Sequence, residues 1–212
     1  MNALTQSLTL RGPAGSLEAL LDTPLLAEGA TTRGTAVIAH PHPQFGGTMT
    51  NKVVQTVARA CVLCGWRALR FNFRGVSASQ GSYDEGRGEL QDMLAAIEQQ
   101  APADAPLLIA GFSFGAFVAS QAIAALQGQR PIARVVLVGT AASRFDVAPI
   151  AAELHEHTLV IHGEQDDTVP LAAVLDWARP QALPVTVVPG GGHFFHGQLP
   201  LLRSLVMRHA RA

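Results

Sequence analysis

The sequence predicts an α/β protein with a mostly parallel β-sheet, an N-terminal antiparallel hairpin, helices on both faces of the sheet and no cap domain. Short, continuous apolar runs, typical of strands buried on both faces, alternate with longer segments whose apolar residues recur at helical spacing. The N-terminal segment instead alternates polar and apolar residues, as a strand with one solvent-facing side does. Strands that alternate with helices favour right-handed crossovers and a parallel sheet.

The N-terminal hairpin is expected from two alternating segments, 7–10 and 16–22, which flank the turn sequence Gly-Pro-Ala-Gly at 12–15. Residues 25–34 are small and polar and predict a surface loop. The buried strands are expected at 35–39, 66–71, 107–110, 134–138, 158–161 and 185–188. The helices are expected at 51–64, 85–100, 114–126, 171–178 and 199–211.

Length and composition favour a single domain over residues 1–212, because α/β folds of this length are commonly one unit. Hydrophobic residues make up 48% of the chain and charged residues 15%, which excludes a disordered protein. A formal net charge of −1 offers no basic field for nucleic acid or for a membrane surface. With no signal-peptide pattern and no apolar stretch of about 18 residues, we expect a cytoplasmic protein.

The sequence Gly-Phe-Ser-Phe-Gly at 111–115 follows an expected strand and opens an expected helix. It is a G-x-S-x-G pattern in the strand–turn–helix context that a nucleophilic serine requires. Its glycines let the strand and the helix approach closely, and the helix N-terminus stabilises developing negative charge. A Gly-rich turn capped by Ser113 is the alternative, and the context favours a nucleophile.

Acidic residues follow the strand expected at 158–161, where a carboxylate can reach a histidine on the next loop. Asp166 is one candidate for this acid. Its neighbour Asp167 lies nearer to Pro170 and is expected to cap the following helix or to face solvent. Asp146, in a segment that resembles a surface turn, is a third candidate.

A histidine follows three glycines after the strand expected at 185–188. This position predicts an exposed loop, so His193 is a candidate general base. His196, one helical turn further on, is expected to be structural.

The remaining histidines and the cysteines predict neither a metal site nor a cofactor. Histidine pairs occur at 40 and 42 and at 155 and 157, but no motif places a third ligand. Cys61 and Cys64 form a C-x-x-C at the C-terminal end of a helix, where the helix dipole does not activate a thiol. Both are expected to be small core residues.

Several segments together carry a resemblance to a known family. The order Ser113, Asp166, His193 is that of the α/β-hydrolase superfamily. The segments are HPHPQFGGTM at 40–49 with NKVV at 51–54, RFNFRGV at 70–76, GFSFG at 111–115 and HFFH at 193–196. With them, the sequence resembles small, cap-less bacterial α/β hydrolases, predicted esterases that are related in shape to dienelactone hydrolases. Ser113 stands where dienelactone hydrolase has cysteine, which argues against a dienelactone substrate.

The resemblance implies a serine hydrolase that cleaves small carboxylic esters through an acyl-enzyme intermediate. Ser113 would be the nucleophile, His193 the base, and Asp166 the acid that orients the imidazole. One oxyanion donor would be the N–H of Phe114. The second is expected after residue 39, where prolines at 41 and 43 have no N–H; His42 is chosen, with Gln44 as the runner-up.

The interval between residues 138 and 158 is too short for a helical lid, so an open site is expected. Phe45, Phe112 and Phe114 could line an apolar acyl pocket. The expected partner is a small-molecule acyl ester, and the sequence leaves thioester and amide substrates open. A catalytically silent, hydrolase-like binding protein is the alternative from another class.

Overall fold

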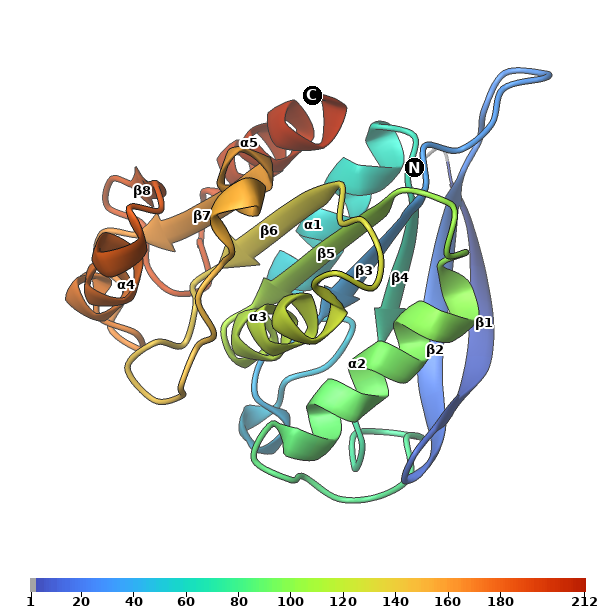
Figure 1. The fold of residues 1–212 in the computed structure, drawn as a ribbon, viewed down its shortest axis with the longest axis horizontal. Coiled ribbons are helices and arrows are strands. Elements are labelled where there is room, and N and C mark those ends of the chain that lie inside the picture. The colour runs from blue at the N-terminus through green and yellow to red at the C-terminus, as the bar shows by residue number, and fades with distance from the viewer. Residues whose placement is uncertain (1–2) are drawn as a thin grey trace.

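The computed structural model describes residues 3–212, and within them eight strands form a single sheet in the order β1-β2-β4-β3-β5-β6-β7-β8 (Figure 1). The strands are β1 (Ala3–Gly12), β2 (Gly15–Pro24), β3 (Thr35–Ala39), β4 (Arg67–Phe71), β5 (Leu107–Phe112), β6 (Arg134–Val138), β7 (Thr158–Gly163) and β8 (Val185–Val188). β1 pairs antiparallel with β2, and β2 pairs antiparallel with β4. All other pairings are parallel, which confirms the predicted fold class.

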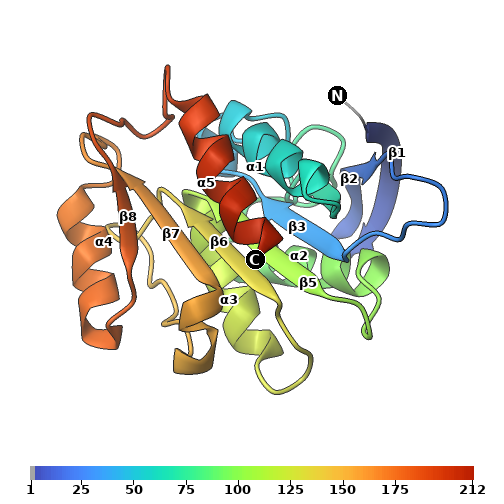
Figure 2. The same cartoon turned by 90° about the horizontal axis from the view of Figure 1, so that it is seen from above.

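Five α-helices of the described chain cover both faces of the sheet, as the view from above shows (Figure 2). They are α1 (Lys52–Leu63), α2 (Arg87–Gln100), α3 (Phe114–Leu126), α4 (Leu171–Ala178) and α5 (Leu199–Arg211). α1 and α5 lie on one face, and their buried residues join one apolar cluster that includes Val57 and Val206. α2, α3 and α4 lie on the other face, in a second cluster that includes Met93 and Val118.

Most elements lie within two residues of the sequence expectation, with β5 and β7 each ending two residues later than expected, and the hairpin and α2 differ for identifiable reasons. The hairpin is longer than the alternating segments, because its ladder continues from the Gly12–Gly15 pair out to Ala3 and Pro24. The helix expected at 85–100 begins at Arg87 instead. Glu85 has a positive φ of 55°, so the backbone turns there before the helix starts.

The cysteines occupy the core, as expected. Cys61 and Cys64 are buried and free, on the helix layer between α1 and α5. Burial raises the pKa of the Cys61 thiol, which opposes formation of a reactive thiolate.

The segment between β6 and β7 spans residues 139–157 and holds only one short 3₁₀ helix, η2 (Ala152–His157), as its short length predicts. The fold therefore has no lid.

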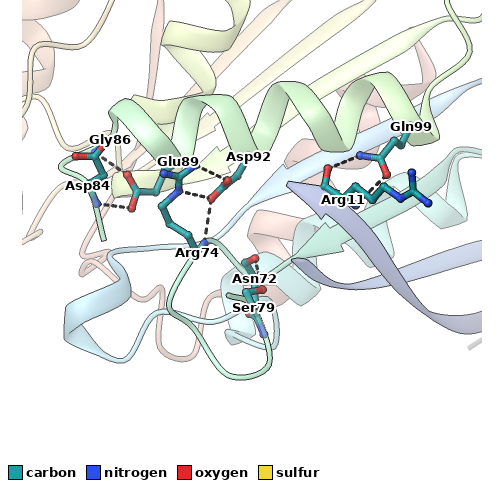
Figure 3. Close-up of polar contacts among 9 residues, drawn as sticks. All are labelled: Arg11, Asn72, Arg74, Ser79, Asp84, Gly86, Glu89, Asp92 and Gln99. Carbon is teal, nitrogen blue, oxygen red and sulfur yellow. Dashed lines mark hydrogen bonds and ion pairs between the residues drawn. The ribbon is translucent and has the colours of Figure 1, made fainter. Parts of the chain in front are cut away.

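The loop between β4 and α2 is held by buried carboxylates of α2 (Figure 3). Asp92 is fully buried and accepts three hydrogen bonds from Arg74: 3.0 Å from the backbone N, 3.0 Å from Nε and 2.8 Å from Nη2. Glu89 accepts from the backbone N–H groups of Asp84 at 3.0 Å and Gly86 at 2.8 Å. Both ends of this loop are thus fixed to one helix.

Replacing Asp92 with asparagine should destabilise the fold by about 3–5 kcal/mol, because the Arg74 guanidinium would lose its buried counter-charge. Urea unfolding measures this loss. The matched control is Asp176→Asn, which breaks an ion pair with Arg179 whose two side chains are 69% and 70% exposed and should change stability little. Equal effects of the two changes would contradict the importance of the buried pair.

Candidate active site

Ser113 occupies a tight turn between β5 and α3. Its backbone has φ 57° and ψ −117°, a conformation that costs a non-glycine residue about 1–3 kcal/mol. The glycines two residues before and two residues after Ser113 are required, because a side chain at either position would clash with the backbone. A Cβ on Gly111 would lie 2.1 Å from the Gly115 carbonyl oxygen, and a Cβ on Gly115 would lie 2.4 Å from the Ala39 carbonyl oxygen. The turn therefore holds the serine at the carboxyl edge of the sheet, next to the end of β3.

The structure brings Ser113, His193 and Asp166 together from the loops after β5, β8 and β7. His193 Nδ1 lies 2.7 Å from Asp166 Oδ2, and His193 Nε2 lies 3.0 Å from Ser113 Oγ. An ionised carboxylate only accepts hydrogen bonds, so Nδ1 carries a proton, and in this tautomer of the ring Nε2 is the nitrogen that accepts from the serine hydroxyl. The three residues are buried, with exposed fractions of 8%, 4% and 7% respectively.

The second carboxylate oxygen of Asp166 organises its own loop. Oδ1 accepts from the backbone N–H of Thr168 at 2.9 Å and of Val169 at 2.7 Å. Burial alone would raise the pKa of Asp166, but hydrogen bonds from His193 and from the Val169 N–H outweigh it, and the net pKa is lowered. The carboxyl is therefore ionised at neutral pH.

His162, the last-but-one residue of β7, lies beside this carboxylate. Its Nε2 is 3.5 Å from Asp166 Oδ2 and 2.9 Å from the Val169 carbonyl oxygen. Burial lowers the pKa of His162, so the ring is neutral at neutral pH and Nε2–H donates to Val169.

The expectation that Asp167 caps α4 is wrong. α4 has Pro170 at its N-cap and no side-chain cap, and the adjacent backbone amides are taken by Asp166. Asp167 is exposed, and its carboxylate accepts only from the Thr168 hydroxyl, at 3.4 Å, among the described residues. It faces solvent, the other role expected for it.

The other two candidates lie at the surface. Asp146 is exposed, and its backbone carbonyl accepts from Gln121. His196 is also exposed, with its ring 6.0 Å from that of Phe194. The hydrogen-bonded line from Ser113 includes neither residue.

A cleft of about 270 Å³ opens over Ser113 and His193. Its walls are largely apolar and include Phe45, Phe114, Phe145 and Phe194. Phe45 and Phe194 are exposed at the rim, by 77% and 45%. Phe145 and Phe194 lie in loops, where no periodic pattern could have singled them out.

Phe112 does not line this cleft, contrary to expectation. It is the last residue of β5, and its side chain belongs with Leu108 and Ala110 to the cluster on the α1 and α5 face. There its ring lies 4.9 Å from the His193 ring. Phe112 therefore supports the imidazole instead of contacting the space above the serine.

The two amides expected to bind an oxyanion belong to residues that line the cleft, Phe114 and His42. Neither N–H donates a hydrogen bond to another described residue. The N–H of the runner-up, Gln44, donates to His42 Nδ1 at 3.2 Å, so it is already engaged. The geometry favours His42 over Gln44.

Among residues 3–212, no group of three or more histidine, cysteine, aspartate or glutamate side chains is arranged to hold a metal ion. No helix in that range is both long enough and apolar enough to span a membrane.

The chain is similar to solved bacterial structures. XC6422 from Xanthomonas campestris, described as an α/β serine hydrolase without a lid, is 37% identical with a TM-score of 0.86, over 98% of this chain and 94% of that one. An α/β serine hydrolase homologue from Coxiella burnetii is 35% identical with a TM-score of 0.78, over 96% of each chain.

An uncharacterized protein of Rickettsia prowazekii (strain Madrid E), RP471, is 46% identical over 91 residues, which is 42% of this chain and 38% of that protein. The family model of the α/β hydrolase domain matches residues 33–200, which contain all three members of the hydrogen-bonded line. The chain belongs to the α/β hydrolase family, and it resembles the members of this family that have no lid.

Proposed function

We propose that this hydrolase cleaves small carboxylic esters through an acyl-enzyme intermediate on Ser113. The observation that carries the proposal is the continuous hydrogen-bonded line from Asp166 through His193 to Ser113, which ends at the floor of an apolar cleft. Ionised carboxylate, imidazole and serine hydroxyl stand in the order that nucleophilic activation requires.

In the proposed reaction the Ser113 hydroxyl gives its proton to His193 Nε2 while Oγ attacks the ester carbonyl carbon. The N–H groups of Phe114 and His42 would receive the resulting oxyanion, each worth about 3–4 kcal/mol of barrier. The imidazolium, stabilised by Asp166, then protonates the departing alkoxide. A water molecule repeats the sequence and releases the acid.

Two features support catalysis over a silent binding role. The serine backbone is held in a strained conformation, which a binding surface has no need to maintain. The buried Asp166 carboxylate is also aligned with the imidazole nitrogen remote from the serine. Thioesters and amides could react at the same groups, and the open cleft is the reason to place small esters first.

Short acyl esters should be the better substrates. The cleft has a volume of about 270 Å³, and no lid covers a longer chain. We expect kcat/KM for acetyl or butyryl esters to exceed that for dodecanoyl esters about tenfold or more. The measurement is a p-nitrophenyl ester series below the critical micelle concentration, with Ser113→Ala as the blank. A steep preference for the long chain would contradict the open-site interpretation.

The same series tests the function itself. Hydrolysis of the short esters that disappears in the Ser113→Ala blank supports a serine esterase. No hydrolysis above the blank with any ester, but turnover of the matching acyl thioesters, would assign the thioesterase alternative.

A further inference from the structure

The loop between β3 and α1, which contains His42, is tied at both ends to the residues that follow β4. At its start, the backbone N–H of Phe73 donates to His40 Nε2 at 3.0 Å. At its end, the backbone N–H of Met49 donates to Asn72 Oδ1 at 2.8 Å. The oxyanion loop, residues 40–49, therefore takes its position from two adjacent residues of the next segment.

That anchoring segment is itself fixed (Figure 3). The Asn72 carbonyl accepts from the Ser79 hydroxyl at 2.7 Å, and the next residue but one, Arg74, is clamped by Asp92 of α2. The His40 and Asn72 side chains therefore attach the oxyanion loop to a rigid part of the fold.

His40 can have only one tautomer here. The ring is fully buried and packs on Phe73 with centroids 4.7 Å apart. Burial lowers the pKa of His40 to about 4, so the ring is neutral at neutral pH. A backbone N–H only donates, so Nε2 is the acceptor and Nδ1 carries the proton. Nδ1–H therefore donates to the carbonyl oxygen of Pro41, at 2.6 Å.

Holding this carbonyl also orients the next amide. The chain has no cis peptide bond in its described part, and in a trans peptide plane the C=O and the following N–H point in opposite directions. The Pro41 carbonyl points to His40, so the N–H of His42 points away from it. The backbone at Gly47 packs directly against this carbonyl, since a Cβ on Gly47 would lie 2.0 Å from its oxygen.

The same region contacts the turn that carries the nucleophile. A Cβ on Gly115 would lie 2.4 Å from the Ala39 carbonyl oxygen and 2.6 Å from that of His40. The Phe114 and His42 amides are therefore built on backbone segments in direct contact, and both residues line the cleft.

We propose that His40 is a positioning residue for the oxyanion hole: its Nδ1–H holds the Pro41 carbonyl and thereby aims the His42 N–H at the oxyanion. The proposal rests on the proposed ester hydrolysis. It assigns His40 no contact with the substrate, so its loss should affect the transition state and leave ground-state binding intact.

Two substitutions separate the two hydrogen bonds of the ring. His40→Asn retains an N–H donor near the Nδ1 position, whereas His40→Gln retains an acceptor near the Nε2 position. We expect His40→Gln to lose about 10²-fold in kcat, comparable to removal of an oxyanion donor, with KM within about twofold. His40→Asn should keep kcat within about tenfold. Rates are expressed per active site, titrated with a fluorophosphonate.

Binding of a trifluoromethyl ketone supplies a readout that a purely structural role would not move. Its adduct with the serine places an oxyanion where the ester intermediate does, so its Ki should rise in His40→Gln in proportion to the loss of kcat/KM. The matched control is Trp66→Phe, which removes a buried hydrogen bond from Nε1 to the Ala210 carbonyl at the amino ends of the strands, the edge of the sheet opposite the site. It should lower stability while kcat per site and Ki stay unchanged.

Retention of kcat per site within about threefold in His40→Gln, or equal losses in both His40 variants, overturns the positioning role. If His40→Gln does not fold, His40→Asn decides: a kcat within tenfold and an unchanged Ki support the role, and a 10²-fold loss overturns it. If the unsubstituted chain labels and hydrolyses esters while the variants match it, only the positioning role fails. No hydrolysis by the unsubstituted chain overturns the proposed function and this inference with it.

Discussion

Replacing Ser113 with alanine should lower ester turnover by about 10⁴- to 10⁶-fold, because the covalent route through the acyl-enzyme is lost and only binding and the oxyanion donors remain. The measurement is kcat/KM for a short ester, on protein shown to be folded by circular dichroism. Activity within about tenfold of the unsubstituted chain would rule out Ser113 as the nucleophile.

Two substitutions of Ser113 distinguish its role in catalysis from its effect on the stability of the fold. Alanine retains a Cβ and therefore the strain at φ 57°, so Ser113→Ala should unfold at nearly the same temperature as the unsubstituted chain. Ser113→Gly should be inactive as well but more stable, by about 1 kcal/mol or more, because glycine tolerates this backbone conformation. Thermal unfolding compares the two variants directly.

Replacing Asp166 with asparagine should lower turnover by about 10⁴-fold, the size of the loss known for the equivalent change in serine proteases. Asparagine can keep an oxygen for the Thr168 and Val169 amides, but it then presents an NH₂ group to His193 Nδ1. That contact favours the tautomer with its proton on Nε2, which cannot accept from the serine.

Asp167→Asn is the matched control one residue away. Its carboxylate is exposed and makes only a long contact with Thr168, so turnover should stay within a few-fold. The measurement is kcat/KM for both variants with one short ester. Inactivation by Asp167→Asn alone would mean that the acid is assigned one residue too early. If neither change matters, Asp146 becomes the candidate.

The order of strands and helices is readable from the chain because each buried strand is a short apolar run and each helix has its own apolar face. The ends of elements are less readable. The start of α2 depends on the positive φ of Glu85 and on Glu89 binding the amides before it, which no periodic pattern reports. Similarly, the hairpin extends beyond its alternating segments through backbone pairing alone.

For the candidate site, loop position after a strand was enough to select Ser113, His193 and the loop that holds the acid, since carboxyl ends of parallel strands share one edge. The choice of Asp166 over its neighbour came from the family resemblance. Loop position did not predict which face of the sheet the Phe112 side chain occupies, or that Asp167 leaves the start of α4 uncapped. Which face the last side chain of a strand occupies, and which of two neighbouring carboxylates meets a helix start, depend on local backbone geometry. The His40 contact with Phe73 joins residues 33 positions apart and is visible only in the fold.

The most direct test of a Ser113 nucleophile is mass spectrometry of the protein after reaction with a fluorophosphonate. We predict one adduct per chain, located on the peptide that contains Ser113, absent from Ser113→Ala and formed much more slowly in Asp166→Asn. No adduct, or an adduct on another residue that persists in Ser113→Ala, would contradict the assignment and favour a silent, hydrolase-like binding protein.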